Sequence, residues 1–247
     1  MTAAVVPPGP PSFEEVRMAC ASYHHNDSRG DVMYRISRRL IDEYWGNPGE
    51  VTDAVALLLL SWNQASYRYG PPDFRRFKMW VMSQWHTLSP LRRLDIAGFD
   101  AQRDSGWVRE LFQGALGALE TSRGTRSPVG VVKAFHLLAP DFFPLWDDQI
   151  ARSYGCKWTC SAEGSDNYLR FMTLTQTLVN HLVTSVARQR QLRPQVALWY
   201  MCQHCPIGAR WNSFLKMLDE YNYVRYTKFW FEDSLTVTDA RLGSLGA

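Results

Sequence analysis

Apolar residues recur at helical spacing along most of the chain. Two segments, 13–25 and 32–45, each place their apolar residues three or four positions apart, on one face of a helix. The block Val55–Leu60 is apolar throughout, which is typical of a core helix, and this helix is expected to begin near Thr52 or Asp53. No segment shows the convincing apolar–polar alternation of a half-buried strand. The pattern therefore predicts an all-α fold.

Clusters of proline and glycine interrupt this pattern, because both residues disfavour the interior of a helix. Breaks are expected at Gly70-Pro71-Pro72, Ser89-Pro90, Asp104-Ser105-Gly106 and Arg193-Pro194. The helices expected around these breaks cover residues 74–85, 107–119, 166–191, 195–201 and 209–221.

The composition is that of a globular protein with a substantial core. Of the 247 residues, 46% are hydrophobic and 21% are charged, which allows one large domain or two closely packed lobes. No apolar run reaches the roughly 18 residues of a membrane span, and residues 1–11 lack the features of a signal peptide. Five cysteines, an odd number, favour a reducing compartment over a disulfide framework. We therefore expect a cytoplasmic protein with no membrane partner.

Charge and aromatic content leave the class of partner open. The formal net charge of +3 permits a polyanionic partner without requiring one. Aromatic residues make up 13% of the chain and include ten tryptophans, which suits stacked bases, sugars or a dense core.

The clearest candidate chemistry lies between positions 130 and 155. Lys133 sits in an apolar run, where partial burial would lower the pKa of its amine and make it a usable nucleophile. Asp147 follows Pro144 and is placed to cap a helix that Gly155 ends. Lys133 and Asp147 are therefore expected to face each other across a short connection. The alternative is a purely structural cap and a solvated lysine.

Polar residues flank this stretch in two further places. The core helix after Leu60 ends abruptly in Ser61–Ser66, whose amides, Asn63 and Gln64, either contact a ligand or satisfy the helix terminus. The linker 121–128 carries Arg123 and Arg126 and no acidic residue. Such a loop is either solvated or available to an anionic ligand close to Lys133.

Three segments together resemble the helix-hairpin-helix DNA glycosylase superfamily, the endonuclease III-like base-excision enzymes. Asp147–Arg152 is similar to the family's Val-Asp-Thr-His-Ile-x-Arg segment, Gly130–Ala134 to the end of its hairpin, and Leu59–Ser66 to its Leu-Leu-Ser-x-Gln-x-Thr stretch. The resemblance covers about residues 31–223. It departs from the family in having a single glycine, Gly130, in place of the Gly-x-Gly turn, and one extra residue in the amide segment.

The resemblance implies a two-lobed helical bundle, expected over residues 13–236, with the active site between the lobes. The small residues and prolines at the ends of the chain predict a disordered tail at 1–12 and a flexible tail at 237–247. Asp147 would be the catalytic aspartate, and Lys133 the nucleophile of a bifunctional member. The residues expected at the DNA or the flipped base are Trp62, Asn63, Gln64, Arg123, Arg126, Gly130, Trp146 and Gln149. Asn63 and Gln64 remain rival candidates for the amide that enters the space left by the base. Other aromatic and basic candidates are Trp158, Arg75, Arg76 and Lys78.

The cysteines form two close pairs, Cys156 with Cys160 and Cys202 with Cys205. Four thiolates in this arrangement would hold Zn²⁺ or an iron–sulfur cluster in a structural role. The chemistry itself requires no cofactor, and the alternative is four inert thiols. The motif of a zinc base deaminase is absent from the sequence.

The resemblance therefore implies a DNA N-glycosylase that flips out and excises a damaged or modified base, and we expect it to be a monomer. One alternative is a glycosylase-fold enzyme that acts on free nucleosides or nucleotides, or on hypermodified viral bases. The other is a helical nucleic-acid-binding module without catalysis. The identity of the base, and a role in repair, phage defence or DNA modification, stay open.

Overall fold

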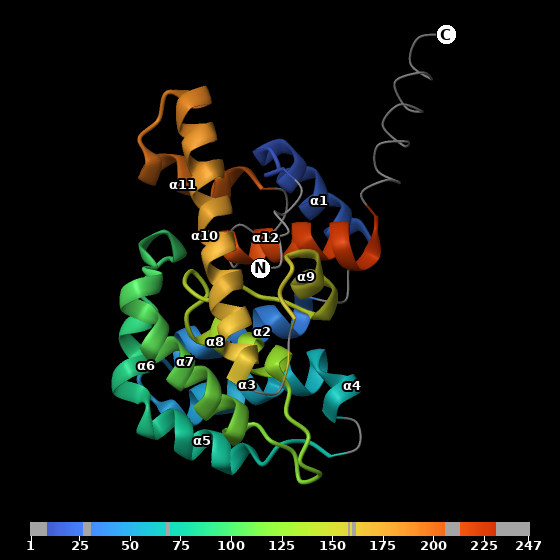
Figure 1. Ribbon diagram of the computed structural model, residues 1–247, viewed down its shortest axis with the longest axis vertical. Helices are drawn as coiled ribbons and strands as arrows, with labels where there is room; N and C mark the ends of the chain where they lie inside the picture. Colours follow the sequence, from blue (N-terminus) through green and yellow to red (C-terminus); the bar gives the residue numbers. More distant parts are fainter. Residues whose placement is uncertain are drawn as a thin grey trace.

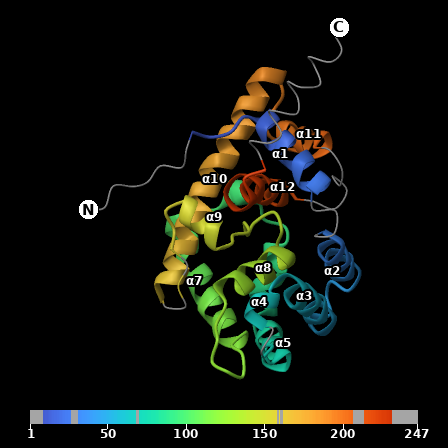
Figure 2. The same ribbon diagram turned by 90° about the vertical axis from the view of Figure 1, so that its right-hand side faces the viewer.

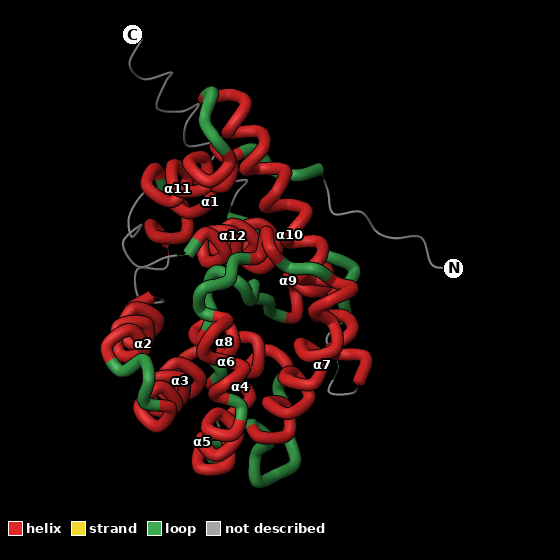
Figure 3. The backbone as a smooth tube through the Cα atoms, turned by 90° about the vertical axis from the view of Figure 1, so that its left-hand side faces the viewer, coloured by secondary structure: helices red, strands yellow, loops and turns green. Residues whose placement is uncertain are grey.

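The computed structural model describes residues 9–26, 31–67, 70–157, 159, 162–205 and 213–230. Within these ranges the backbone consists of helices joined by loops, and no strand is present (Figure 3). The predicted all-α class is confirmed. Among the described helices, none is both long and apolar enough to span a membrane.

The helices follow one another with short connections. The elements from the first part of the chain are α1 (Phe13–Asn26), α2 (Asp31–Glu43), α3 (Pro48–Trp62), α4 (Gln64–Tyr67), α5 (Phe74–Ser83), α6 (Trp85–Leu91) and the short 3₁₀ helix η1 (Ile96–Gly98). Those from the second part are α7 (Ala101–Ala118), α8 (Pro128–Leu138), α9 (Asp148–Ser153), α10 (Ala162–Arg190), α11 (Pro194–His204), α12 (Phe214–Asn222) and the π-helical turn η2 (Tyr223–Lys228).

Two groups of helices can be followed in Figures 1 and 2. In the lower group, α3 packs against α2, α5 and α8, and α8 also contacts α6 and α7. In the upper group, α12 packs against α1, α11 and η2, and η2 contacts α9. The long helix α10 runs beside both groups, since it contacts α7 and η1 as well as α11.

Helix α8 is apolar on nearly every face, whereas α12 buries an apolar face together with the polar residues Lys216, Glu220 and Asn222. Burial of this apolar surface supplies the main driving force for packing, about 25 cal/mol per Å². Each helix also carries one lysine among its apolar residues, Lys133 in α8 and Lys216 in α12. The fully or almost fully buried residues of the two helices include Val131, Val132, Ala134, Phe135, Leu137, Phe214, Leu215, Met217 and Leu218.

Several predicted helix boundaries are wrong. The helix expected over 74–85 ends at Ser83, and the expected break at Ser89-Pro90 lies inside α6, which continues to Leu91. Helix α3 begins at Pro48, earlier than expected, because Asn47 caps it by accepting from the Gly49 N–H at 3.1 Å and proline suits the first helical position. Helix α7 runs through the expected break at 104–106. Asp100 caps this helix, and the Asp104 carboxylate accepts from the Asp100 N–H at 2.8 Å, so Asp104, which suggested a turn, secures the start of the helix.

The predicted ends of α9 are confirmed. The Asp147 carboxylate accepts from the Ile150 N–H at 2.7 Å, as an N-cap does. At the other end Gly155 has φ +66°, and the Cys156 N–H donates to the Ala151 carbonyl at 2.8 Å. This is a Schellman motif, in which glycine adopts the left-handed conformation at no steric cost. The cap fixes the position of the Asp147 side chain.

Candidate active site

A cavity of about 230 Å³ lies between the two groups of helices. It receives side chains from α3 and α8 below, from α1, α12 and η2 above, and from the loop that leads into α9. Its lining residues are Tyr23, Trp62, Lys133, Leu145, Trp146, Asp147, Asp219 and Tyr223. Lys133 and Asp147, which the sequence suggested would face each other, therefore meet in one cavity.

The Lys133 amine is held by two uncharged acceptors. Its Nζ donates to the Trp62 carbonyl at 2.9 Å and to Asn63 Oδ1 at 3.1 Å. Burial lowers the pKa of Lys133 to about 8, and the carboxyls of Asp219 and Asp147 oppose this shift. Two of the tetrahedral positions on the nitrogen are thus used, and the third carries a proton in the ammonium or a lone pair in the free amine.

The Asp147 carboxylate is fixed at both of its oxygens. Oδ1 accepts from the Ile150 N–H, and Oδ2 accepts from the Thr227 hydroxyl at 2.9 Å. A carboxylate has about four acceptor positions, so each oxygen keeps one for a ligand. The two contacts tie the carboxylate to α9 and to η2, which gives it a defined orientation at the cavity wall.

A buried polar network lies behind Lys133. Asn63 Nδ2 donates to Ser127 Oγ at 2.9 Å, and the same hydroxyl accepts from the Gly130 N–H at 3.0 Å. A side chain at Gly130 would overlap the Tyr67 hydroxyl and lie 3.1 Å from Asn63 Nδ2. The glycine therefore allows α8 to approach the amide that holds Lys133. This contact gives Gly130 a packing role of its own.

The rival amides have different surroundings. Asn63 is buried, and both ends of its side chain are engaged by Lys133 and Ser127. Gln64, the first residue of α4, is exposed. Asn63 is therefore an internal support of the site in this structure, and Gln64 is the amide that a partner can reach.

Helix α12 adds three ionisable residues that the sequence analysis missed. Asp219 lines the cavity with 17% of its side chain exposed, and its Oδ2 lies 3.4 Å from the buried Lys216 Nζ. Lys216 Nζ also donates to Glu220 Oε1 at 3.1 Å. Lys216, Asp219 and Glu220 have the i, i+3, i+4 spacing of one helix face, so the signal was present in the sequence.

The two α12 carboxyls respond differently to this environment. The pKa of Asp219 is raised to about 6. Burial is the main cause, Asp147 and Glu220 also raise the pKa, and Lys216 opposes the shift. Burial would also raise the pKa of Glu220, but Lys216 and His24 outweigh it, so the net shift is downward. Glu220 is thus the carboxylate that balances Lys216, and Asp219 is the one that titrates near neutrality.

Aromatic rings form the walls of the cavity. Trp62 stacks on Tyr34, with ring centroids 5.5 Å apart and an interplanar angle of 15°, and Lys133 Nζ lies 5.8 Å from the Trp62 ring centroid. Trp146 is buried against Tyr168 and Phe171. Both tryptophans expected at the base therefore line the cavity. Trp158 lies outside the described residues.

The expected phosphate contacts lie away from the cavity lining. Arg123 and Arg126 are exposed on the loop before α8, where Arg126 pairs with Glu120 at 3.2 Å. Arg76 donates to the backbone carbonyls of Ala118 and Glu120. Of the other candidates, Arg75 and Gln149 are exposed and Lys78 is half-buried.

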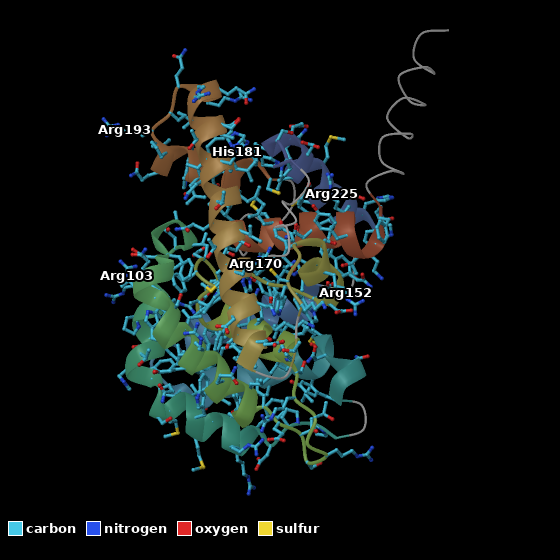
Figure 4. The ribbon with its side chains drawn as sticks, viewed as in Figure 1. Arg103, Arg152, Arg170, His181, Arg193 and Arg225 are labelled. Atoms are coloured by element: carbon cyan, nitrogen blue, oxygen red, sulfur yellow. The ribbon has the colours of Figure 1, made fainter. Side chains whose placement is uncertain are left out.

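Figure 4 places Arg152 and Arg225 on one side of the molecule, where α9 and η2 pack together. Arg152 is exposed and pairs with Asp148 at 2.9 Å, and Arg225 donates to the Tyr221 hydroxyl at 3.0 Å. Because Asp147 precedes α9 and Tyr223 opens η2, these arginines bring positive charge to the elements that carry two of the lining residues. The sequence analysis gave neither arginine a role, although Arg152 ends the segment Asp147–Arg152 that carries the resemblance.

The cysteines are distributed over separate elements. Cys156 follows α9, whereas Cys202 and Cys205 lie at the end of α11, and Cys205 contacts the Cys20 thiol of α1. Burial raises the pKa of Cys156 to about 11 and that of Cys202 to about 12. Cys160 is outside the described residues, and the residues that are described include no group of three or more His, Cys, Asp and Glu side chains placed to hold a metal ion. The four-cysteine site stays a prediction.

Comparison with known proteins leaves the site to be interpreted from its own geometry. No protein-family model matches the chain, and neither a curated protein nor a solved structure matches it.

Proposed function

We propose that this protein is a DNA N-glycosylase that excises a damaged or modified base. The observation that carries the proposal is that Lys133 and Asp147 line one aromatic-walled cavity between two groups of helices. In this proposal the two groups are the two lobes of a glycosylase, and the cavity takes a base that has left the stack. A cavity of about 230 Å³ suits the snug pocket that such enzymes provide for one flipped base.

The proposed chemistry follows from the positions of the two side chains. Breaking the N-glycosidic bond builds positive charge on the sugar, and the fixed Asp147 carboxylate stabilises that charge. The same carboxylate can take a proton from the water that adds to C1′. Lys133 offers a second route, because its amine can attack C1′ and form a Schiff base that leads to strand cleavage. With a pKa of about 8, a useful fraction of this amine is uncharged near neutral pH.

A second candidate is an enzyme that cleaves the same bond in a free nucleoside or nucleotide. It is favoured by the internal engagement of Arg76 and Arg126, because cations that pair with the protein are less available to a phosphate backbone. A third is a nucleic-acid-binding module in which the cavity has no catalytic role.

One assay separates the three candidates. Duplexes that each carry a different modified base are incubated with the protein, and abasic sites are detected by alkaline cleavage. Free nucleosides are tested in parallel, and DNA binding is measured by a mobility shift. Base release from at least one duplex supports the glycosylase. Release from nucleosides alone supports the second candidate, and binding without release from either substrate supports the module.

A further inference from the structure

Two carboxyls, rather than one, reach the cavity that we assign to the base and its sugar. Asp147 enters from the loop before α9, and Asp219 enters from α12. The two interact electrostatically, and the Asp219 carboxyl has a larger effect on Lys133 than the Asp147 carboxyl has. Asp219 is therefore a part of the same constellation.

The charges around Asp219 explain why it differs from Asp147. On its own helix, Lys216 faces both Asp219 and Glu220, and the shorter contact, 3.1 Å against 3.4 Å, goes to Glu220. His24 of α1 lies 3.3 Å from the second oxygen of Glu220. Glu220 therefore has the shorter contact with Lys216 and also faces His24, whereas Asp219 shares Lys216 and reaches the cavity.

Other titratable groups lie on the elements around α12. Lys133 of α8 and Asp147 before α9 are the charged groups across the cavity, and Tyr23 of α1 and Tyr223 of η2 are its phenols. On α11, burial keeps the Cys202 thiol uncharged by raising its pKa to about 12. A negative charge on Asp147 makes a second one on Asp219 less favourable, and this adds to the effect of burial in raising the pKa of Asp219.

We infer that Asp219 is the general acid that protonates the departing base, and that the substrates are uncharged bases that leave only after accepting a proton. This inference rests on the proposed glycosylase function. A cationic alkylated base differs, because it becomes neutral as soon as the C1′–N bond breaks. The constellation thus distinguishes two classes of modified base by charge.

The step balances as follows. The Asp219 carboxyl gives its proton to a ring nitrogen or carbonyl oxygen of the base, and the electron pair of the C1′–N bond leaves with the base. Asp147 stabilises the sugar cation and takes a proton from the water whose oxygen bonds to C1′. Transfer of that proton back to Asp219, directly or through solvent, restores both carboxyls, and the net reaction is hydrolysis.

The test is the pH profile of single-turnover base release by the wild type, Asp219→Asn and Asp219→Glu. For an uncharged base, wild-type release should fall as pH rises above about 6, because Asp219 loses its proton there. Asp219→Asn should be slower by roughly 10² or more and should lose this dependence on pH. Asp219→Glu restores a carboxyl and should recover the falling profile at a reduced rate.

The control is a duplex with 7-methylguanine, a cationic base. Its release, relative to spontaneous loss, should fall far less in Asp219→Asn than the release of the uncharged base falls. If Asp219→Asn slowed the release of both kinds of base equally, Asp219 would be a structural residue. If the variant released the uncharged base at the wild-type rate and with the wild-type pH profile, the inference would be wrong but the proposed function would stand. No release of any base by the wild type would instead overturn the proposed function, and this inference with it.

Discussion

The two lysines beside the cavity, the half-buried Lys133 and the buried Lys216, have opposite surroundings. Lys133 donates to a backbone carbonyl and to an amide oxygen, both uncharged. Lys216 is fully buried against two carboxyls, and its Nζ lies 4.8 Å from the Tyr23 ring centroid and 5.6 Å from that of Tyr34. The comparison indicates that the partners of a lysine, and not its burial alone, decide whether its amine keeps its charge. An amine without a close counter-ion can give up its proton, whereas one paired with carboxylates serves as a fixed positive charge.

The largest expected effect is on stability, and it separates the two lysines directly. Lys216→Met leaves two carboxyls facing an apolar side chain, and loss of one partner from a buried ion pair costs about 3–5 kcal/mol. Lys133→Met leaves two uncharged acceptors unsatisfied, at a smaller cost of about 1–3 kcal/mol. Urea unfolding of both variants measures the difference. If Lys133→Met proves the more destabilising, the distinction between the two lysines is wrong.

The next effect concerns the pH dependence of stability through Asp219. Its folded-state pKa of about 6 lies above the ordinary value of 3.8, so the folded state binds this proton more tightly. The resulting stabilisation is present below the ordinary pKa and is lost as pH rises to about 6, a change of about 3 kcal/mol. Relative to the wild type, Asp219→Asn should therefore gain stability between about pH 4 and 7. A constant difference in unfolding free energy over that range would contradict the assigned environment.

Gly130→Ala tests the support behind Lys133. The added methyl would meet Tyr67 and Asn63, and overpacking of this kind costs about 1–3 kcal/mol. Gly117→Ala is the matched control, because its Cβ would meet nothing within 4 Å and alanine is the better helix former by about 0.5–1 kcal/mol. Thermal melts should show a loss for the first variant and a small gain for the second. If the two substitutions changed the melting temperature equally, the packing role assigned to Gly130 would be wrong.

The last prediction tests whether Lys133 is the nucleophile. If its amine attacks C1′, borohydride should trap a covalent adduct with the wild type and none with Lys133→Gln. On a duplex that already carries an abasic site, where no base has to leave, the rate of trapping should rise about tenfold per pH unit below the pKa of about 8, because only the free amine reacts. Peptide mapping should place the adduct on Lys133. An adduct on Lys216 would contradict the distinction between the two lysines. If the enzyme is active but borohydride traps no adduct, water is the nucleophile.

The sequence predicts those parts of the fold and the candidate site that depend on local pattern. The all-α class follows from apolar periodicity, and the cap at Asp147 and the left-handed Gly155 follow from residue types within one turn of a helix. The same local reasoning fails at 104–106, because Asp104 is read as a turn residue unless its bond back to Asp100 is known.

What the sequence leaves undecided depends on contacts between distant segments. The apolar setting of Lys133 marks it as a candidate, but Asn63, which holds it, belongs to a helix terminus far away in the chain. Lys216 and Asp219 share a helix face by spacing, yet only the packing of α12 opposite α8 brings Asp219 to the cavity. Similarly, the choice between Asn63 and Gln64 depends on which one turns toward Ser127, and the spacing of the segment does not decide this.

The most direct test of the account is single-turnover base release by Asp147→Asn and Asp148→Asn, on a duplex from which the wild type releases a base. Asn caps a helix about as well as Asp, so both variants should fold. Asp147→Asn should be slower by roughly 10² or more, the cost of losing one electrostatic stabiliser, whereas Asp148→Asn should retain the wild-type rate because its carboxylate pairs with exposed Arg152. An Asp147→Asn protein that is folded and fully active would contradict the central claim that this cavity carries the chemistry.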